Sequence, residues 1–255
     1  MSAAILNADT HLQEVLRLAD TSLILGQRLA EWCGHGPVLE EDIALTNIAL
    51  DLIGQSRLLL TRAGELEGRG RDEDQLAFLR TESEFRNLTI VELPNGDFAQ
   101  TMLRNLLVTA WQREQWQALL TSSDEAIAAI AAKSLKETRY HVQHSADWVV
   151  RLGDGTEQSH ARAQRALDTL WPYTAEFFAE AREDGVDAAS DALALASSQS
   201  GWEATVLPVL EVATLSVPMR SAFVSRGKFG VHTEHLGHLL TEMQVLQRTY
   251  PGGTW

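Results

Sequence analysis

The sequence predicts an all-α protein built as a helical bundle, on three observations. Stretches rich in Ala, Leu, Glu, Gln and Arg, which are good helix formers, run uninterrupted between the six prolines. Apolar residues recur within these stretches mainly at three- and four-residue spacing. Strand signals are nearly missing, since the closest candidate, residues 87–93 (NLTIVEL), ends at Pro94 and is equally compatible with a helix end. Long helices joined by short polar turns pack as bundles.

Start and stop signals place the expected helices in order. The first, over residues 9–33, ends at the Gly-His-Gly-Pro run that starts at Gly34. The second, over 40–67, begins at three acids, whose charge suits the positive end of a helix dipole, and ends at Gly68. Further helices are expected over 73–86, 97–121, 124–152, 157–184, 188–212 and 231–249. Because no repeat or linker interrupts the chain, a single domain over 1–255 is expected.

Composition excludes several classes of protein. The 255 residues carry a formal net charge of -14, and a nucleic-acid binder would normally show a basic face. Cys33 is the only cysteine, so no intrachain disulfide is possible, which fits a reducing compartment. The N-terminus lacks the basic and apolar regions of a secretory signal. No apolar run approaches the ~18 residues of a membrane span. We therefore expect a cytoplasmic protein that binds neither nucleic acid nor membrane.

A polar stripe crosses the second expected helix in the segment IALTNIALDLIGQSRLLL. Asn47, Asp51 and Gln55 lie at positions i, i+4 and i+8 among apolar neighbours. A helix that is apolar nearly all round is usually buried, so the stripe is expected to face protein rather than water. A buried Asp is costly unless it is paired or binds a metal. An internal hydrogen-bond network is the favoured interpretation, with a metal or catalytic role and a solvated groove as alternatives.

A second polar cluster lies in the segment KETRYHVQHS, residues 136–145. Glu137, His141 and His144 stand at i, i+4 and i+7 and would share one helical face. A carboxylate and two imidazoles can bind a metal. Such a cluster is more often a salt-bridged helix face, here with Glu137 beside Lys133 or His141.

A di-iron bundle requires more than one such helix. Its ligands are a Glu from each of two helices and a Glu-x-x-His from each of the other two. In this chain only Glu157 is followed by a His three residues later, His160, and this pair stands at the start of an expected helix. Glu137 has Tyr140 at that position. The sequence therefore predicts that the di-iron ligand set is missing.

The C-terminal region carries the only basic cluster of this acidic chain. Its members, which suit a contact with an anion or an acidic partner surface, are Arg220, Arg226, Lys228 and His232. The following helix adds Glu234, His235, His238 and Glu242. Capping and interface roles are favoured for the 232–242 cluster over a mononuclear metal site. Nucleophile-elbow, phosphate-loop and dinucleotide motifs are missing from the sequence.

Three segments carry a resemblance to a known family. They are RLAEWCGHGPVLEEDIALTNIALDLIGQSR (28–57), LKETRYHVQHSADWVVRLGDGT (135–156) and GKFGVHTEHLGHLLTEMQVLQR (227–248). Together they resemble the C subunits of the multicomponent 1,2-phenylacetyl-CoA epoxidases, which are ring-1,2-monooxygenases. The resemblance runs over nearly the whole chain.

The resemblance implies a ferritin-like helical bundle with additional helices, and a role in aerobic phenylacetate catabolism. In that family the A subunit holds the di-iron centre and binds phenylacetyl-CoA, while a reductase subunit uses FAD and an iron–sulfur cluster. The C subunit resembles an A subunit without metal ligands and binds A tightly. The resemblance therefore implies no cofactor in this chain. The A subunit is the expected partner, with the B and reductase subunits as further ones.

Two functions from different classes remain open at this point. The first is a non-catalytic structural subunit, in which a vestigial di-iron pocket is filled by hydrogen-bonded polar residues; this predicts no catalytic, cofactor-binding or metal-ligating residue. Its candidate pocket residues are Asp51, Gln55, Glu137, Tyr140 and His141. The second is a metal-dependent ferritin-like oxidoreductase that uses Glu137 and His141 or the 232–242 cluster. A ferritin-type storage protein is a third and weaker interpretation.

Overall fold

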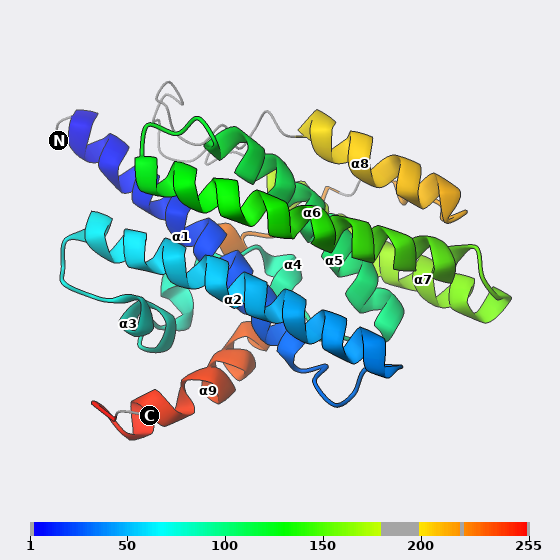
Figure 1. Ribbon diagram of the computed structural model, residues 1–255, viewed down its shortest axis with the longest axis horizontal. Coiled ribbons are helices and arrows are strands. Elements are labelled where there is room, and N and C mark those ends of the chain that lie inside the picture. Colours follow the sequence, from blue (N-terminus) through cyan, green and yellow to red (C-terminus); the bar gives the residue numbers. More distant parts are fainter. Residues whose placement is uncertain (1–2, 180–198, 220–221, 254–255) are drawn as a thin grey trace. The chain divides into compact units, whose positions relative to one another are not determined.

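The computed structural model describes residues 3–179, 199–219 and 222–253 (Figure 1). Helices form nearly all of the regular structure in these residues, and the single extended pairing among them is an isolated bridge between Arg226 and Val231. The all-α prediction is confirmed. The chain forms two compact units, Met1–Pro94 with Arg226–Trp255 (unit 1) and Asn95–Ser225 (unit 2). The single domain stays a prediction.

Unit 1 is built on two long helices, α1 (Ala3–Ala30) and α2 (Leu39–Glu67), which pack along one another. Gly26 of α1 permits the close approach, because a Cβ there would lie 3.1 Å from Ile53 Cγ1 and 3.3 Å from the Ala49 carbonyl oxygen. The shorter elements of the unit are α3 (Glu73–Phe78), η1 (Glu82–Glu84), α4 (Thr89–Glu92), η4 (Gly227–Phe229) and α9 (Glu234–Thr249).

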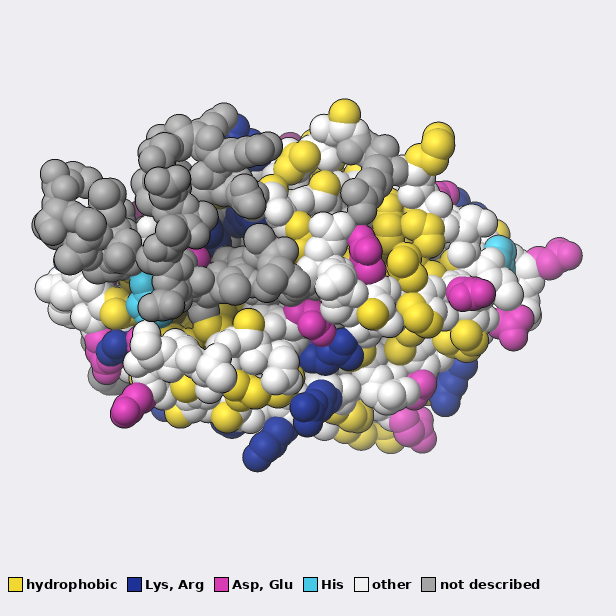
Figure 2. Space-filling view, turned by 90° about the horizontal axis from the view of Figure 1, so that it is seen from above, with side chains coloured by type: hydrophobic (Ala, Val, Ile, Leu, Met, Phe, Trp, Pro, Cys, Tyr) yellow, Lys and Arg dark blue, Asp and Glu magenta, His cyan; other side chains and the backbone are white. Residues whose placement is uncertain are grey.

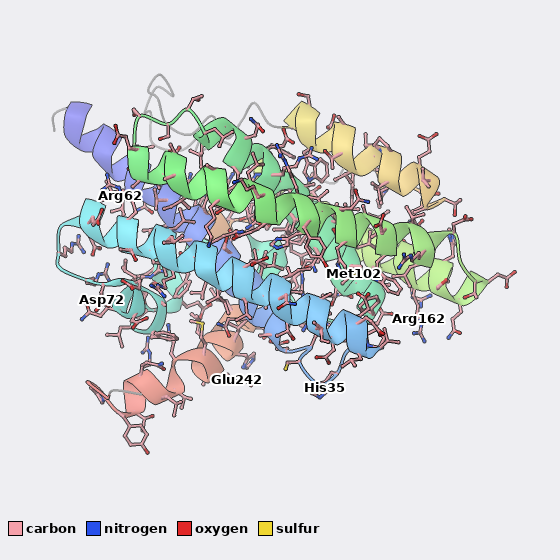
Figure 3. All side chains as sticks on the ribbon, in the orientation of Figure 1. His35, Arg62, Asp72, Met102, Arg162 and Glu242 are labelled. Atoms are coloured by element: carbon pink, nitrogen blue, oxygen red, sulfur yellow. The ribbon has the colours of Figure 1, made fainter. Side chains whose placement is uncertain are left out.

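Local signals set the end of α2 and the start of α3 as the sequence predicts. Gly68 ends α2 in the left-handed conformation, with φ 66°. The Asp72 carboxylate accepts a hydrogen bond from the backbone N–H of Gln75, whose side chain accepts one in return from the Asp72 backbone N–H. This capping box starts α3; Asp72 is labelled in Figure 3, together with Arg62 on α2.

Unit 2 contains α5 (Phe98–Leu119), α6 (Glu125–Gly153), α7 (Glu157–Leu170), η2 (Trp171–Phe178) and α8 (Gln199–Val212). Helix α5 packs against α6, α7 and α8, and most of its residues are buried. The Asp97 and Asp124 side chains cap α5 and α6 by accepting hydrogen bonds from backbone N–H groups. The Trp202 indole N–H donates to the Leu107 carbonyl at 2.8 Å and ties α8 to α5.

Four expected elements differ from those observed. The first helix, expected over 9–33, begins at Ala3 and ends at Ala30. The helix expected over 73–86 ends at Phe78, because Arg80 leaves the helix to pair with Asp20 of α1. Residues 89–92, within the ambiguous 87–93 segment, form the short helix α4. The helix expected over 157–184 ends at Leu170 and continues as the 3-10 helix η2, since Pro172 cannot extend the α-helical ladder. Residues 180–184 and 188–198 of the expected helices lie outside the described residues.

Candidate functional site

The polar stripe on α2 runs from the surface into the core of unit 1. Asn47 is exposed, Asp51 is half-buried and Gln55 is fully buried. The stripe therefore faces protein only at its C-terminal end. Asp51 and Gln55, both predicted to belong to a vestigial pocket, lie in unit 1, whereas Glu137, Tyr140 and His141 lie in unit 2. The shared pocket stays a prediction.

One side of α2 leaves apolar residues exposed along most of its length. We call this side the α2 outer face; its members are Leu39, Ile43, Asn47, Leu50, Gly54 and Leu58. The opposite side is buried, through residues such as Leu45, Leu52 and Leu59. By length and composition alone α2 is apolar enough to cross a bilayer, and 44% of the apolar window is buried inside the structure. Core helices of soluble proteins can have the same length and composition. The expectation that the protein binds no membrane is therefore neither supported nor contradicted by this helix.

The buried face of α6 in unit 2 carries hydroxyls and one imidazole. Ser134, Thr138, His141 and Ser145 recur at helical spacing, and all are at most 1% exposed. The Ser145 hydroxyl donates to the His141 carbonyl at 2.8 Å. This face has no carboxylate of its own, although di-iron bundles project carboxylates from such positions.

Glu137 and its aromatic neighbours lie at the edge of this face. The Glu137 carboxylate is 3.3 Å from the Lys133 ammonium, so the salt-bridge interpretation of the segment is correct for this pair. Tyr140 is half-exposed, and its ring stacks at a tilt on that of His144, with centroids 5.9 Å apart. Of the three unit 2 residues expected in the vestigial pocket, Glu137, Tyr140 and His141, only His141 points into the core.

The single Glu-x-x-His sequence stands at the N-terminal end of α7, as predicted. Glu157 is the first residue of the helix and is exposed. His160 Nδ1 lies 2.8 Å from the Gly153 carbonyl oxygen at the end of α6. The imidazole thus joins two helix ends, and the pair does not stand at mid-helix where a di-iron ligand would.

The predicted basic cluster is only partly at the surface. Arg220 lies outside the described residues. Arg226 is exposed, while Lys228 is buried with its ammonium 5.4 Å from the centre of the Phe229 ring. The anion or partner contact of this cluster stays a prediction.

His232 is held inside unit 1 by two acceptors. Nδ1 lies 3.1 Å from Glu92 Oε2, and Nε2 lies 3.0 Å from the Phe85 carbonyl oxygen. Burial lowers the pKa of His232, but the hydrogen bond and charge of Glu92, together with the Phe85 carbonyl, outweigh it and raise that pKa. Since neither acceptor can donate, both ring nitrogens donate and the imidazolium is the favoured form. Glu92 also accepts from the backbone N–H of Thr233, at 2.8 Å.

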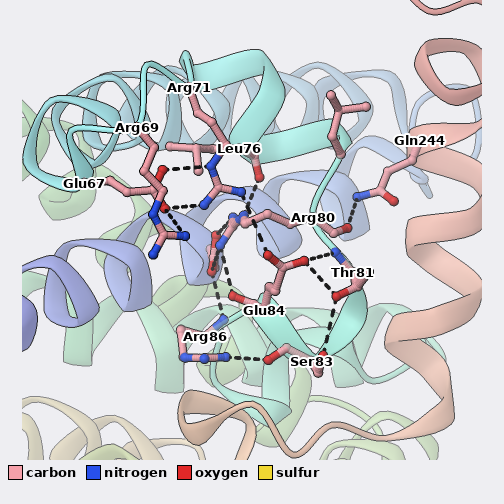
Figure 4. A network of polar contacts seen from close by, with 12 residues as sticks. Glu67, Arg69, Arg71, Leu76, Arg80, Thr81, Ser83, Glu84, Arg86 and Gln244 are labelled. Carbon is pink, nitrogen blue, oxygen red and sulfur yellow. Dashed lines mark hydrogen bonds and ion pairs between the residues drawn. The ribbon is translucent and has the colours of Figure 1, made fainter.

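A buried ion pair organises the same unit and was not found from the sequence (Figure 4). Asp20 of α1 is fully buried and is paired with the guanidinium of Arg80, which is 2% exposed. The same carboxylate accepts from the backbone N–H of Arg86 at 2.8 Å. Gln244 of α9 donates to the Arg80 carbonyl at 3.1 Å. The only signal in the sequence is a lone Asp inside an apolar helix, which does not name its partner.

No group of three or more His, Cys, Asp or Glu side chains is placed to hold a metal within the part of the chain that the structure describes. His238 and Glu234 of the 232–242 cluster are exposed on α9.

An open pocket of about 340 Å³ in unit 2 is lined by residues of α5 and α6. Those residues, none of which was expected in the vestigial pocket, are Arg113, Glu114, Gln117, Leu135 and Arg139.

Exposed hydrophobic side chains also gather in and after α8. They are Leu207, Val212, Val217, Met219, Phe223 and Val224. Figure 2 views the molecule from the α8 side and shows hydrophobic and acidic side chains next to one another there.

Two comparisons place the chain among known proteins. The family model described as "Phenylacetic acid catabolic protein" matches residues 3–255. The chain is 48% identical over 242 residues to the C subunit of the 1,2-phenylacetyl-CoA epoxidase of Escherichia coli (strain K12). That alignment covers 94% of this chain and 97% of the relative. The resemblance drawn from the sequence is confirmed, and the all-α architecture is that of the ferritin-like bundle it implied. The chain belongs to the phenylacetic acid catabolic protein family.

Proposed function

We propose that this chain is a non-catalytic, structural subunit of a 1,2-phenylacetyl-CoA epoxidase in aerobic phenylacetate catabolism. In this proposal it binds the catalytic A subunit, which carries the di-iron centre, in the cytoplasm. The B subunit and the reductase, with its FAD and iron–sulfur cluster, complete the assembly. The observation that carries the proposal is the 48% identity to the C subunit of such an epoxidase, spread over 94% of the chain.

The donor residues of the chain support the non-catalytic part of the proposal, because they do not fit a di-iron centre. The buried face of α6 presents Ser134, Thr138 and Ser145 with one imidazole. On α2 the fully buried polar residue that was expected in the pocket is the amide Gln55. Hydroxyls and amides are poor ligands for iron in a carboxylate-bridged site, which needs a Glu from each of four helices.

Internal partners already engage the residues of the alternative function, a metal-dependent oxidoreductase. Glu137 is paired with Lys133, and His232 uses both ring nitrogens within unit 1. A metal at either place would have to break these contacts. A structural subunit, in contrast, acts by binding the folded form of its partner, which stabilises that form by mass action.

The experiment is co-expression of this chain with the A subunit of its epoxidase, followed by metal analysis of each purified chain. The proposal expects a stable complex, iron in the A subunit and at most trace metal in this chain. It also expects the A subunit alone to be less soluble and less active than the pair. Stoichiometric iron or manganese in this chain would favour the oxidoreductase, and an A subunit that is equally soluble and active alone would refute the structural role.

A further inference from the structure

The open pocket of unit 2, between α5 and α6, collects side chains that donate hydrogen bonds. Three of its five lining residues are donors of this kind: Arg113 and Gln117 of α5, and Arg139 of α6. Its volume of about 340 Å³ suits a small molecule, since ligand pockets span roughly 300–1,000 Å³. All of the lining residues belong to unit 2, so the pocket is complete within that unit.

The guanidinium of Arg113 is held in place from two sides. Its Nε and Nη2 donate to Glu114 Oε1 at 3.1 and 2.8 Å, and Nη2 also donates to the Thr205 hydroxyl of α8. Nη1 has no acceptor in the described ranges of the chain. Because the guanidinium is already oriented, a ligand that accepts from Nη1 would immobilise little further side-chain freedom.

Arg139 brings a second guanidinium to the pocket from α6. It is exposed, and among the described residues it has no hydrogen bond or ion pair. Its surroundings on α6 are basic although the chain as a whole is acidic. Lys133, Lys136 and Arg139 fall within residues 133–139, where the one acid, Glu137, is paired with Lys133. Two positive charges at one pocket favour an anion between them.

Glu114 is the one carboxylate that lines the pocket, and other groups of unit 2 already use it. Oε1 accepts both hydrogen bonds from Arg113. Oε2 lies against α8 at Gly201, where a Cβ would overlap with it, so the glycine permits this close approach. The lining thus sets two guanidinium groups against one carboxylate, and the charge of Arg139 is left over. A small anion would balance it.

We propose that this pocket binds a small molecule through an oxyanion group, a carboxylate or a phosphate, held between Nη1 of Arg113 and the guanidinium of Arg139. Guanidinium groups form charge-assisted hydrogen bonds with both kinds of oxyanion. The Gln117 amide supplies a further donor, and Leu135 supplies an apolar contact for the rest of the ligand. The proposal goes beyond the proposed function, which uses none of these residues.

Isothermal titration calorimetry of the full-length chain tests the site. Sodium phosphate and sodium acetate are titrated separately, at a constant ionic strength set with sodium chloride. We expect saturable binding of at least one of the two anions to a single site. Arg139→Gln should weaken this binding at least ~10-fold, because it removes a charge-assisted contact. Since Arg139 has no partner among the described residues, the unfolding temperature of this variant without anion should equal that of the wild type.

Two further variants separate the site from a general effect of charge. Arg165→Gln on α7 is the matched control, because it removes the same charge from an exposed position of unit 2 that does not line the pocket. It should bind the anion as the wild type does. Arg139→Lys keeps the charge but loses the planar guanidinium, so its affinity should lie between those of the wild type and Arg139→Gln.

The two anions also identify the chemistry of the ligand. Binding of phosphate alone would assign a phosphate group to it, and binding of acetate alone would assign a carboxylate; either result supports the site. Lack of saturable binding of both anions would overturn the proposal. Wild-type affinity in Arg139→Gln would overturn it as well, and so would an equal loss in Arg139→Gln and Arg165→Gln.

Discussion

Two sets of buried polar residues, one in each unit, differ in kind and in what they hold. The set in unit 1 is charged and paired and fixes segments outside the long helices: Asp20 of α1 binds Arg80 and the Arg86 backbone, and Glu92 of α4 binds His232. The set on α6 of unit 2 consists of hydroxyls and one imidazole on a helix whose backbone is already satisfied by its own ladder. The difference teaches that burial of a polar residue alone does not indicate how much that residue contributes to folding stability.

The physical reason lies in the backbone. Residues 79–88 have few helical hydrogen bonds, so their buried N–H and C=O groups need side-chain partners. The Thr21 hydroxyl, for example, accepts from the Leu88 N–H at 3.2 Å. Thr138 on α6 has no hydrogen-bond partner for its hydroxyl among the described residues. Removing a polar group should therefore be costly in unit 1 and nearly neutral on α6.

The largest effect is expected from Asp20→Ala. It leaves the buried guanidinium of Arg80 without its carboxylate and the Arg86 N–H without its acceptor. Breaking one side of a buried pair costs about 3–5 kcal/mol of unfolding free energy, which urea denaturation of the full chain would measure. Glu65→Ala is the control, because its pair with Arg62 lies at the surface and is worth about 0–1 kcal/mol. Equal losses in the two variants would contradict the comparison.

The second effect depends on pH and concerns His232. Because the folded state raises the pKa of His232, the stabilising contribution is complete below the unfolded pKa of about 6.5 and is lost as pH rises through the folded value. The charge-assisted hydrogen bonds are worth about 1.5–3 kcal/mol. The difference in unfolding free energy between the wild type and His232→Gln should therefore shrink as pH rises above about 6.5.

Thermal unfolding of both chains between about pH 5.5 and 9 would measure this difference. His238→Gln, at an exposed position on α9, is the matched control for replacing a histidine by glutamine. A difference that stays constant or grows with pH would show that His232 is bound as the neutral imidazole.

These features show how much the sequence can predict. Helix ends set by neighbouring residues, such as the Asp124 cap of α6 and Gly68 at the end of α2, are correct within one residue. The end of α3 was missed because Arg80 leaves the helix for a partner 60 residues away. The apolar pattern of α2 predicted burial on all sides, since hydrophobic periodicity does not distinguish a side chain in the core from an apolar side chain left exposed.

In the candidate site, too, local features were predictable from the sequence, whereas contacts between residues far apart in the chain were not. The presence of only one Glu-x-x-His sequence, at the start of a helix, is visible directly in the sequence, and the Glu137–Lys133 pair follows from i, i+4 spacing. The engagement of His232 by Glu92 could not be predicted, because 140 residues separate them. A local cluster of basic residues therefore looked like a surface patch, although the structure places two of its members inside unit 1.

The smallest effect, and the sharpest comparison, comes from one substitution made in both units. Thr21→Val and Thr138→Val each replace a buried hydroxyl by a methyl group of the same shape. In unit 1 the change removes the acceptor of the Leu88 N–H, and we expect a loss of about 1–3 kcal/mol for the buried donor left behind. On α6 no donor is abandoned, and removing an unpartnered hydroxyl from a buried site should leave stability unchanged or raise it by up to about 1 kcal/mol.

Urea denaturation of the two variants under identical conditions measures both values, and equal denaturant slopes would show that the denatured state has not changed. A loss at Thr138 as large as that at Thr21 would mean that the α6 hydroxyls are structural after all. The α6 face would then be a polar network required for the fold, as the charged network of unit 1 is. A neutral result would mean that folding stability does not require these hydroxyls, and it would agree with the proposal that the α6 face belongs to a vestigial pocket.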